Sequence, residues 1–298
     1  MVTSTADSGL GSLREAISLA NANGTLVNDV ISFNLADVTV AGRTIILLSA
    51  LPALSSHLTI DGSTQRGSAF GVSDAKVTIQ YLYEANTPQT VFIINECTDI
   101  NIFGLKLDNQ IIWTAWYEET TCVNIWKSDH INIGGKGKGN LFINWIHTIF
   151  TSAPVGLVCK DIKIQSNIFG IEDDGETAAY NVHVIEINRI ENLEVGGEEA
   201  EEGNVIAASR RRILIGGPSG TILIANNKIG TNCSGTKMLS MPYGESNLLH
   251  DNISVLNSGW AYEINYKTEI RIINNLSTGY CSSGIKIQAI YSKKQQCQ

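Results

Sequence analysis

Short alternations of apolar and polar residues recur along the chain at a nearly constant spacing. One series of apolar-x-apolar triplets begins at Ile100, Ile131, Ile162, Leu193 and Ile222, so its members lie 31, 31, 31 and 29 residues apart. Gly, Ser or Asn ends each alternation after a few residues. Alternation with period two is typical of a strand, and a fixed period of about 20 to 50 residues is typical of a solenoid.

Two further repeats accompany this series. A second set of apolar positions runs slightly ahead of the first and contains Ile93, Val123, Leu157, Val184 and Ile213. A longer repeat relates residues 130–175 to residues 192–236. It matches Gly134-Gly135 with Gly196-Gly197, Gly139-Asn140 with Gly203-Asn204, and Asn167 with Asn227. Two coils of a solenoid per long repeat account for this pattern.

The short strands predict a solenoid because one unit cannot bury its apolar side alone. Stacked units can, with each strand paired in parallel to the equivalent strand about 4.8 Å away in the next coil. A β-sandwich would show hairpin turns instead, and a doubly wound fold would need helices, of which none is visible after residue 24. Gly and Asn tolerate the left-handed backbone that sharp corners need. We expect an inward ladder of Ile133, Ile164, Val195 and Ile224.

The first residues follow a different pattern, that of an amphipathic helix over residues 12–23. Ser12 and Glu15 have capping-box spacing, Gly24 is a typical C-terminal stop, and the apolar stripe contains Leu13, Ala16, Ile17 and Ala20. Such a helix would cover the open end of the first coil. The sequence therefore predicts one domain over residues 1–298, with an N-terminal α-helical cap over residues 1–24 and coils over residues 25–298.

The opening stretches are VTSTADSGLGSLREAISLANANG, VISFNL and LPALSSHLTIDGSTQRG. They resemble bacterial right-handed parallel β-helix proteins with the N-terminal "CSLREA" signature, in the pectate-lyase-like superfamily, although Gly11 stands in place of the Cys. The later units of the form GG…GN-x-I extend the resemblance over nearly the whole chain. It implies an all-β, right-handed parallel β-helix with an N-terminal helical cap. It also implies an extracellular or cell-surface location, as a fragment of a larger secreted protein, although no signal peptide follows Met1.

Charge and composition narrow the classes of partner. The net charge is −8, which disfavours nucleic acid as a partner. No apolar stretch reaches the roughly 18 residues that a membrane helix requires, so no membrane span is expected. The six cysteines show neither a C-x-x-C pair nor a histidine at metal-ligand spacing, and we expect buried or half-buried thiols in reduced form. The oligomeric state does not follow from these observations.

Aromatic residues are concentrated between residues 113 and 145. Flat exposed rings stack on the C–H faces of sugars, and neighbouring carboxylates can accept hydrogen bonds from sugar hydroxyls. We therefore take six residues as a candidate carbohydrate-binding site, namely Trp113, Trp116, Tyr117, Trp145, Glu118 and Glu119. The competing interpretation is a hydrophobic cluster beneath a long loop.

Catalytic residues are not identified by the sequence. The acidic runs, Glu172-Asp173-Asp174 and Glu198–Glu202, read as solvated turns or loops, and His130, His147, His183 and His250 lack partners at triad or metal spacing. Asp173 and Asp174 are candidates for binding calcium, the one metal considered. The favoured function is a non-catalytic surface module, a rigid scaffold or adhesin that binds carbohydrate. The alternative is a polysaccharide lyase or glycoside hydrolase with a groove along one sheet.

Overall fold

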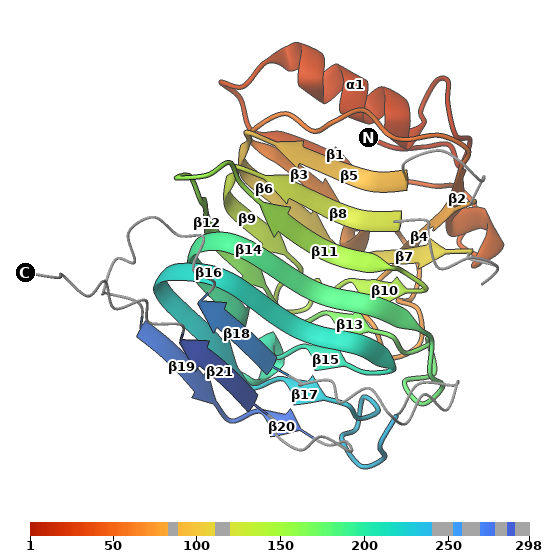
Figure 1. The fold of residues 1–298 in the computed structure, drawn as a ribbon. Helices are drawn as coiled ribbons and strands as arrows, with labels where there is room; N and C mark the ends of the chain where they lie inside the picture. Colours follow the sequence, from red (N-terminus) through yellow and green to blue (C-terminus); the bar gives the residue numbers. More distant parts are fainter. Residues whose placement is uncertain (83–88, 111–119, 240–252, 258–268, 278–284, 290–298) are drawn as a thin grey trace, which may run out of the picture.

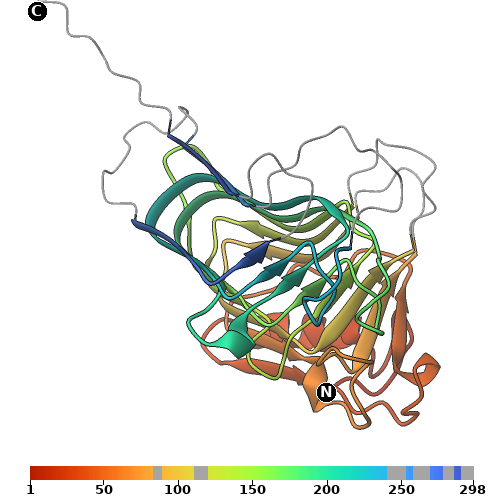
Figure 2. The ribbon, with the colours of Figure 1, turned by 90° about the horizontal axis from the view of Figure 1, so that it is seen from below.

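The fold is an all-β parallel β-helix that carries one α-helix at its N-terminal end (Figure 1). The computed structural model describes residues 1–82, 89–110, 120–239, 253–257, 269–277 and 285–289. Every pairing between its strands is parallel, and each strand pairs with its equivalents in the coils before and after it. Seen from the end opposite α1, the coils wrap around one interior (Figure 2). No helix of the described part is long and apolar enough to cross a membrane.

Each full coil contributes strands to three faces, which we name A, B and C. Face A contains β5 (Gln89–Asn95), β8 (Thr120–Trp126), β11 (His147–Ser152), the first half of β14 (Asn181–Gly196), the first half of β16 (Ser209–Ala225), β18 (Ile253–Asn257) and β21 (Ile285–Ala289). Face B contains β1 (Asp29–Ser32), β3 (Leu58–Asp61), β6 (Thr98–Phe103), β9 (Asp129–Ile133), β12 (Cys159–Ile164), the second halves of β14 and β16, and β19 (Glu269–Ile273).

Face C is a separate sheet of eight short strands. It contains β2 (Thr44–Leu47), β4 (Val77–Tyr81), β7 (Leu105–Asn109), β10 (Leu141–Ile143), β13 (Ile168–Phe169), β15 (Val205–Ile206), β17 (Lys228–Ile229) and β20 (Leu276–Ser277). Faces A and B form one continuous sheet because β14 and β16 run through the corner between them. The described strands thus form eight coils and begin a ninth with β21.

The predicted inward ladder on face B is confirmed. Ile133 pairs with Ile164, Ile164 with Val195, and Val195 with Ile224, one coil at a time. All four side chains are fully buried in the main hydrophobic core. Because side chains alternate between the two sides of a strand, the polar residues between them face outward, as Lys163 and Glu194 do.

The second apolar series is only partly correct. The strands of face A place Phe92, Val123, Ile149, Ile185 and Ile213 in one buried ladder. The prediction therefore named Ile93 in place of Phe92 and Val184 in place of Ile185. At Leu157 it chose a residue that lies outside the strands and is 44% exposed. The corners vary in length from coil to coil, so a constant period drifts off the true register on this face.

The N-terminal helix α1 (Leu13–Asn23) begins and ends close to the predicted residues. The Ser12 hydroxyl accepts a hydrogen bond from the Glu15 N–H at 3.1 Å. The Glu15 carboxylate accepts from the Gly11 N–H at 2.5 Å, one residue before the partner that a capping box uses. The predicted apolar stripe is buried, and α1 lies across the first coil (Figure 1).

Removal of residues 1–24 is expected to cause association of the chain through its N-terminal end. Without α1, the apolar end of the first coil and the backbone groups of β1 become accessible, and an open parallel edge pairs readily with another. Analytical ultracentrifugation should show a weight-average mass that rises more steeply with concentration than for the intact chain. Leu19→Ser, on the exposed side of α1, is the control and should match the intact chain. A truncated chain that sediments as the intact one does would contradict this role of the cap.

The corner between faces A and B carries a column of residues with left-handed backbone. Their φ angles lie between 51° and 62° in His57, Asp99, His130, Asp161 and Asn192. The sequence predicted Gly and Asn at such corners, whereas Asp and His occupy most of this one. Asn, Asp and His are the non-glycine residues most enriched in left-handed backbone, which explains why Asp and His can stand at these corners in place of Gly.

Five asparagines form a ladder inside the corner between faces B and C. At each rung, the backbone N–H and the side-chain amide of one asparagine donate to the Oδ1 atom of the next, at 2.9–3.1 Å. The members are Asn140, Asn167, Asn204, Asn227 and Asn275. None of them has a positive φ angle, so these asparagines serve as hydrogen-bonding side chains and not as left-handed corner residues.

Candidate functional site

The outer side of face A brings together polar side chains that the sequence left scattered. In both His147–Phe150 and His183–Glu186, the two middle residues are buried and the first and last are half-buried. Strict alternation would place the first and fourth residues on opposite sides of the strand. The two consecutive buried residues shift this alternation, so the first and the fourth both face outward. The ladder then aligns His147 with His183 and Phe150 with Glu186.

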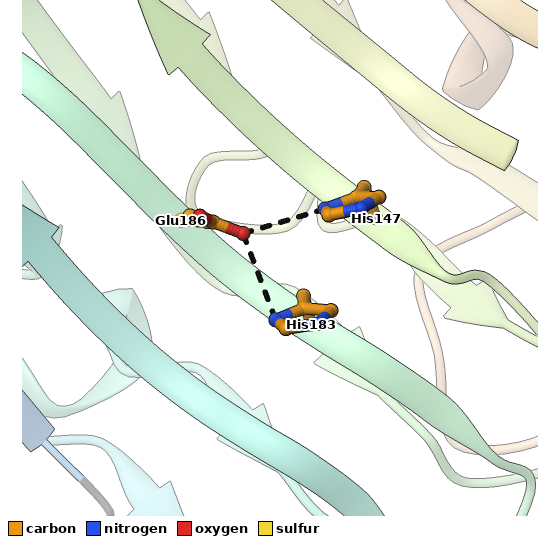
Figure 3. Close-up of side chains that lie close together, drawn as sticks. All are labelled: His147, His183 and Glu186. Atoms are coloured by element: carbon orange, nitrogen blue, oxygen red, sulfur yellow. Dashed lines mark ion pairs between the residues drawn. The ribbon is translucent and has the colours of Figure 1, made fainter. Parts of the chain in front are cut away.

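Three of these side chains converge across two successive coils (Figure 3). The rings of His147, on β11, and His183, on β14, are stacked with centroids 4.7 Å apart and planes 8° apart. The Oε2 atom of Glu186 lies 3.3 Å from Nδ1 of His147 and 3.6 Å from Nδ1 of His183. Each side chain is between 16% and 19% exposed, so the cluster is recessed in the outer side of face A.

The surroundings of this cluster combine aromatic and amide side chains. The ring of Phe150 meets the His147 ring edge-on, with centroids 5.8 Å apart. Asn124, on β8, is paired with Phe150 in the ladder. Trp126, at the end of β8, is 37% exposed. We define the face A surface as Thr121, Asn124, Trp126, His147, Phe150, His183 and Glu186. It extends over the three successive strands β8, β11 and β14.

The chemistry of the face A surface is that of imidazoles beside one carboxylate. Glu186 is the only Asp or Glu in β5, β8, β11 and the face A halves of β14 and β16. A carboxylate accepts hydrogen bonds and an imidazole donates or accepts them, so both residue types can bond to a hydroxyl-bearing ligand. Among the residues that the structure describes, this is also the one group of His, Cys, Asp or Glu whose ligand atoms converge as a metal site requires.

The predicted carbohydrate site is corrected at Trp145. Its side chain is fully buried, and its Nε1–H donates to the Leu107 carbonyl at 2.9 Å. A ring held in this way inside the core cannot stack on a sugar, so the hydrophobic interpretation applies to this residue. The other five members of that site, Trp113, Trp116, Tyr117, Glu118 and Glu119, lie outside the described residues.

Asp173 and Asp174, the candidates for binding calcium, both make contacts within the fold. The Asp173 carboxylate lies 2.9 Å from the Lys106 ammonium. Asp174 caps its own turn, because it accepts hydrogen bonds from the Thr177 hydroxyl and from the backbone N–H groups of Glu176 and Thr177. These hydrogen bonds, the Thr177 hydroxyl first, lower the pKa of Asp174 to about 2. Calcium binding by Asp173 and Asp174 stays a prediction.

The described cysteines are free, as the sequence predicted. Cys97, Cys122 and Cys159 are buried and Cys233 is half-buried. Burial raises the pKa of all four thiols, that of Cys233 to about 11, which keeps them protonated and poorly nucleophilic. Cys281 and Cys297 lie outside the described residues.

Sequence reasoning missed the histidine pair because of the same register error that affected Leu157. The signal was present in the sequence as two similar segments, HTIF at residues 147–150 and HVIE at residues 183–186. Had Ile149 been aligned with Ile185, the two histidines would have fallen on the same rung. Comparison of the chain with protein-family models, curated proteins and solved structures found no match. The resemblance to "CSLREA" β-helix proteins therefore stays a prediction.

Proposed function

We propose that the chain is a non-catalytic binding module whose rigid β-helix presents the face A surface to an extended carbohydrate. The observation that carries this proposal is the row of outward polar and aromatic side chains over β8, β11 and β14. The strands beneath it are held by buried ladders, so the row is preorganised and little entropy is lost on binding. A ligand lying along the axis would meet equivalent positions about every 4.8 Å.

The side chains of this row suit the chemistry of sugars. Trp126 and Phe150 offer ring surface to the C–H faces of a pyranose, and Asn124 offers both donor and acceptor atoms to its hydroxyls. Glu186 and the two histidines add acceptors and donors at the recessed centre. The negative net charge disfavours acidic polymers, so neutral glycans are the better fit.

A binding role is favoured over hydrolysis because the carboxylates are too few. Glycoside hydrolysis generally requires two carboxyl groups flanking the scissile bond, and the face A strands named above carry Glu186 alone. A polysaccharide lyase or hydrolase remains the competing hypothesis, and release of reducing ends is its signature. We also propose an extracellular or cell-surface location, as the resemblance of the N-terminal segment implies.

A glycan-array screen followed by titration tests the proposal. Trp126→Ala and Phe150→Ala are each expected to weaken binding of the selected glycan about fivefold, since one aromatic contact contributes roughly 1 kcal/mol. The matched control is Phe103→Ala, which removes a half-buried aromatic ring from face B. Affinity unchanged in the folded face A variants would refute this location of the site. Release of reducing ends from the glycan would instead support the enzyme.

A further inference from the structure

We propose that His147, His183 and Glu186 form a binding site for a divalent transition metal ion of the zinc class. In a tetrahedral site with bonds of about 2.1 Å, ligand atoms lie about 3.4 Å apart. The two imidazole Nδ1 atoms lie 3.3 Å and 3.6 Å from the Glu186 Oε2 atom, and all three ligand atoms lie within 4.8 Å of one another. The backbone thus brings three donor atoms close together.

A second observation concerns the Nδ1 atom of His147. It is buried from solvent and makes no hydrogen bond, although it faces the Glu186 carboxylate. A buried imidazole nitrogen without a hydrogen bond is costly, and such atoms in native structures usually serve a function. A metal ion at the centre of the cluster would supply its partner.

The donor set selects the class of metal. Two imidazole nitrogens and one carboxylate suit zinc and its neighbours among the transition metals, whereas calcium and magnesium require sites built from oxygen. Three protein ligands leave a fourth position for water or for an oxygen of a bound ligand. The three side chains are between 16% and 19% exposed, whereas the donor atoms that face one another are buried.

Metal binding should change the stacking of the two rings. The lone pair of an imidazole nitrogen lies in the ring plane, so two rings only 8° from parallel cannot both direct it at one ion between them. One ring must rotate about its Cβ–Cγ bond to complete the site. The ion would then link β11 to β14, and with them two successive coils of face A.

Other histidine–carboxylate contacts in the described part of the chain lack this geometry and provide the control. His130 lies 3.5 Å from Asp161 at the corner between faces A and B. Its side chain is 60% exposed, and no third donor converges on it in the described residues. Replacement of His130 removes a surface imidazole while leaving the proposed site intact.

Equilibrium dialysis of the chelator-treated full chain against Zn²⁺, with elemental analysis, tests the site without any glycan. We expect one ion at this site, with affinity reduced about 100-fold or more by His147→Gln or Glu186→Gln, since loss even of indirect partners costs 10–100-fold. His130→Gln should bind as the parent does. Zinc affinity unchanged from that of the parent in both site variants would overturn the proposal. Absence of zinc binding by the parent, or binding of calcium as tight as that of zinc, would overturn it as well.

Cobalt(II) absorption provides a readout that does not depend on the stability of a variant. The intact chain loaded with Co²⁺ should give the intense visible bands of a four-coordinate ion, and Zn²⁺ should displace them stoichiometrically. Weak bands typical of hexahydrated cobalt would overturn the assignment even if His147→Gln failed to fold. Because neither measurement involves carbohydrate, the metal site and the proposed glycan-binding function succeed or fail separately.

Discussion

Ile164→Asp is expected to lower the free energy of unfolding by about 4 kcal/mol or more, enough to unfold many domains of ordinary stability. Ile164 is fully buried and lies between Ile133 in the preceding coil and Val195 in the following one. An aspartate there must either remain charged without a partner or take up a proton, and both alternatives are costly in an apolar ladder. Urea unfolding followed by circular dichroism measures the change.

Lys163→Ala is the matched control, one residue earlier on the same strand. Lys163 faces outward, and its ammonium lies 2.9 Å from the Glu194 carboxylate. Its side chain is 52% exposed, and an exposed ion pair contributes less than about 1 kcal/mol. If Ile164→Asp unfolded at the same urea concentration as Lys163→Ala, the inward register of β12 would be wrong.

The fold could be predicted because two independent periodicities agree on face B. Alternation with period two identified which side of each strand is buried, and the 31-residue step identified which strands are neighbours. Ile131 and Ile162 satisfy both conditions, and the structure pairs them. The helix was equally accessible, since its cap, its apolar stripe and its terminating Gly24 are all local in sequence.

Face A was less predictable because the step between its strands is not constant. Thr121, His147 and His183 occupy one row of the ladder, yet they are separated first by 26 and then by 36 residues. The two consecutive buried residues in these strands also shift the alternation. Neither effect has a strong local signal, and both act on the residues that form the candidate site.

Trp145 illustrates a different limit of sequence reasoning. Its place among clustered aromatic residues suggested an exposed ring, but its indole N–H donates to the Leu107 carbonyl inside the core. A tryptophan is well suited to a core position when a buried carbonyl needs a donor, since the ring fills volume and the nitrogen makes the bond. Such a requirement depends on the preceding coil and is invisible in the segment itself.

The other large expected effect is a loss of stability on substitution of Asn204, the middle member of the asparagine ladder. The Oδ1 atom of Asn204 accepts hydrogen bonds from both the backbone N–H and the side-chain amide of Asn167, at 3.0 and 3.1 Å. Its own amide donates to the Ile164 carbonyl at 2.8 Å and to the Oδ1 of Asn227 at 2.9 Å. Asn204 is only 1% exposed, so water cannot readily replace these partners.

Asn204→Ala is therefore expected to lower the free energy of unfolding by about 3–5 kcal/mol. The substitution leaves two donors of Asn167 and the acceptors on Ile164 and Asn227 without this partner, and each buried group left unsatisfied costs about 1–3 kcal/mol. The total falls below the simple sum because the remaining side chains can relax and water can enter the space that the amide leaves. Urea unfolding again provides the measurement.

Two further variants separate hydrogen bonding from loss of volume. Asn204→Asp keeps the shape and the acceptor but cannot donate to Ile164, and its charge faces the Oδ1 of Asn227, so it should destabilise at least as much as alanine. Asn275→Ala, at the half-buried last rung of the described ladder, should cost less, because solvent can reach the groups it leaves. Equal stability of Asn204→Asp and the parent would show that the donated hydrogen bonds contribute nothing. The ladder would then hold the coils together through packing alone.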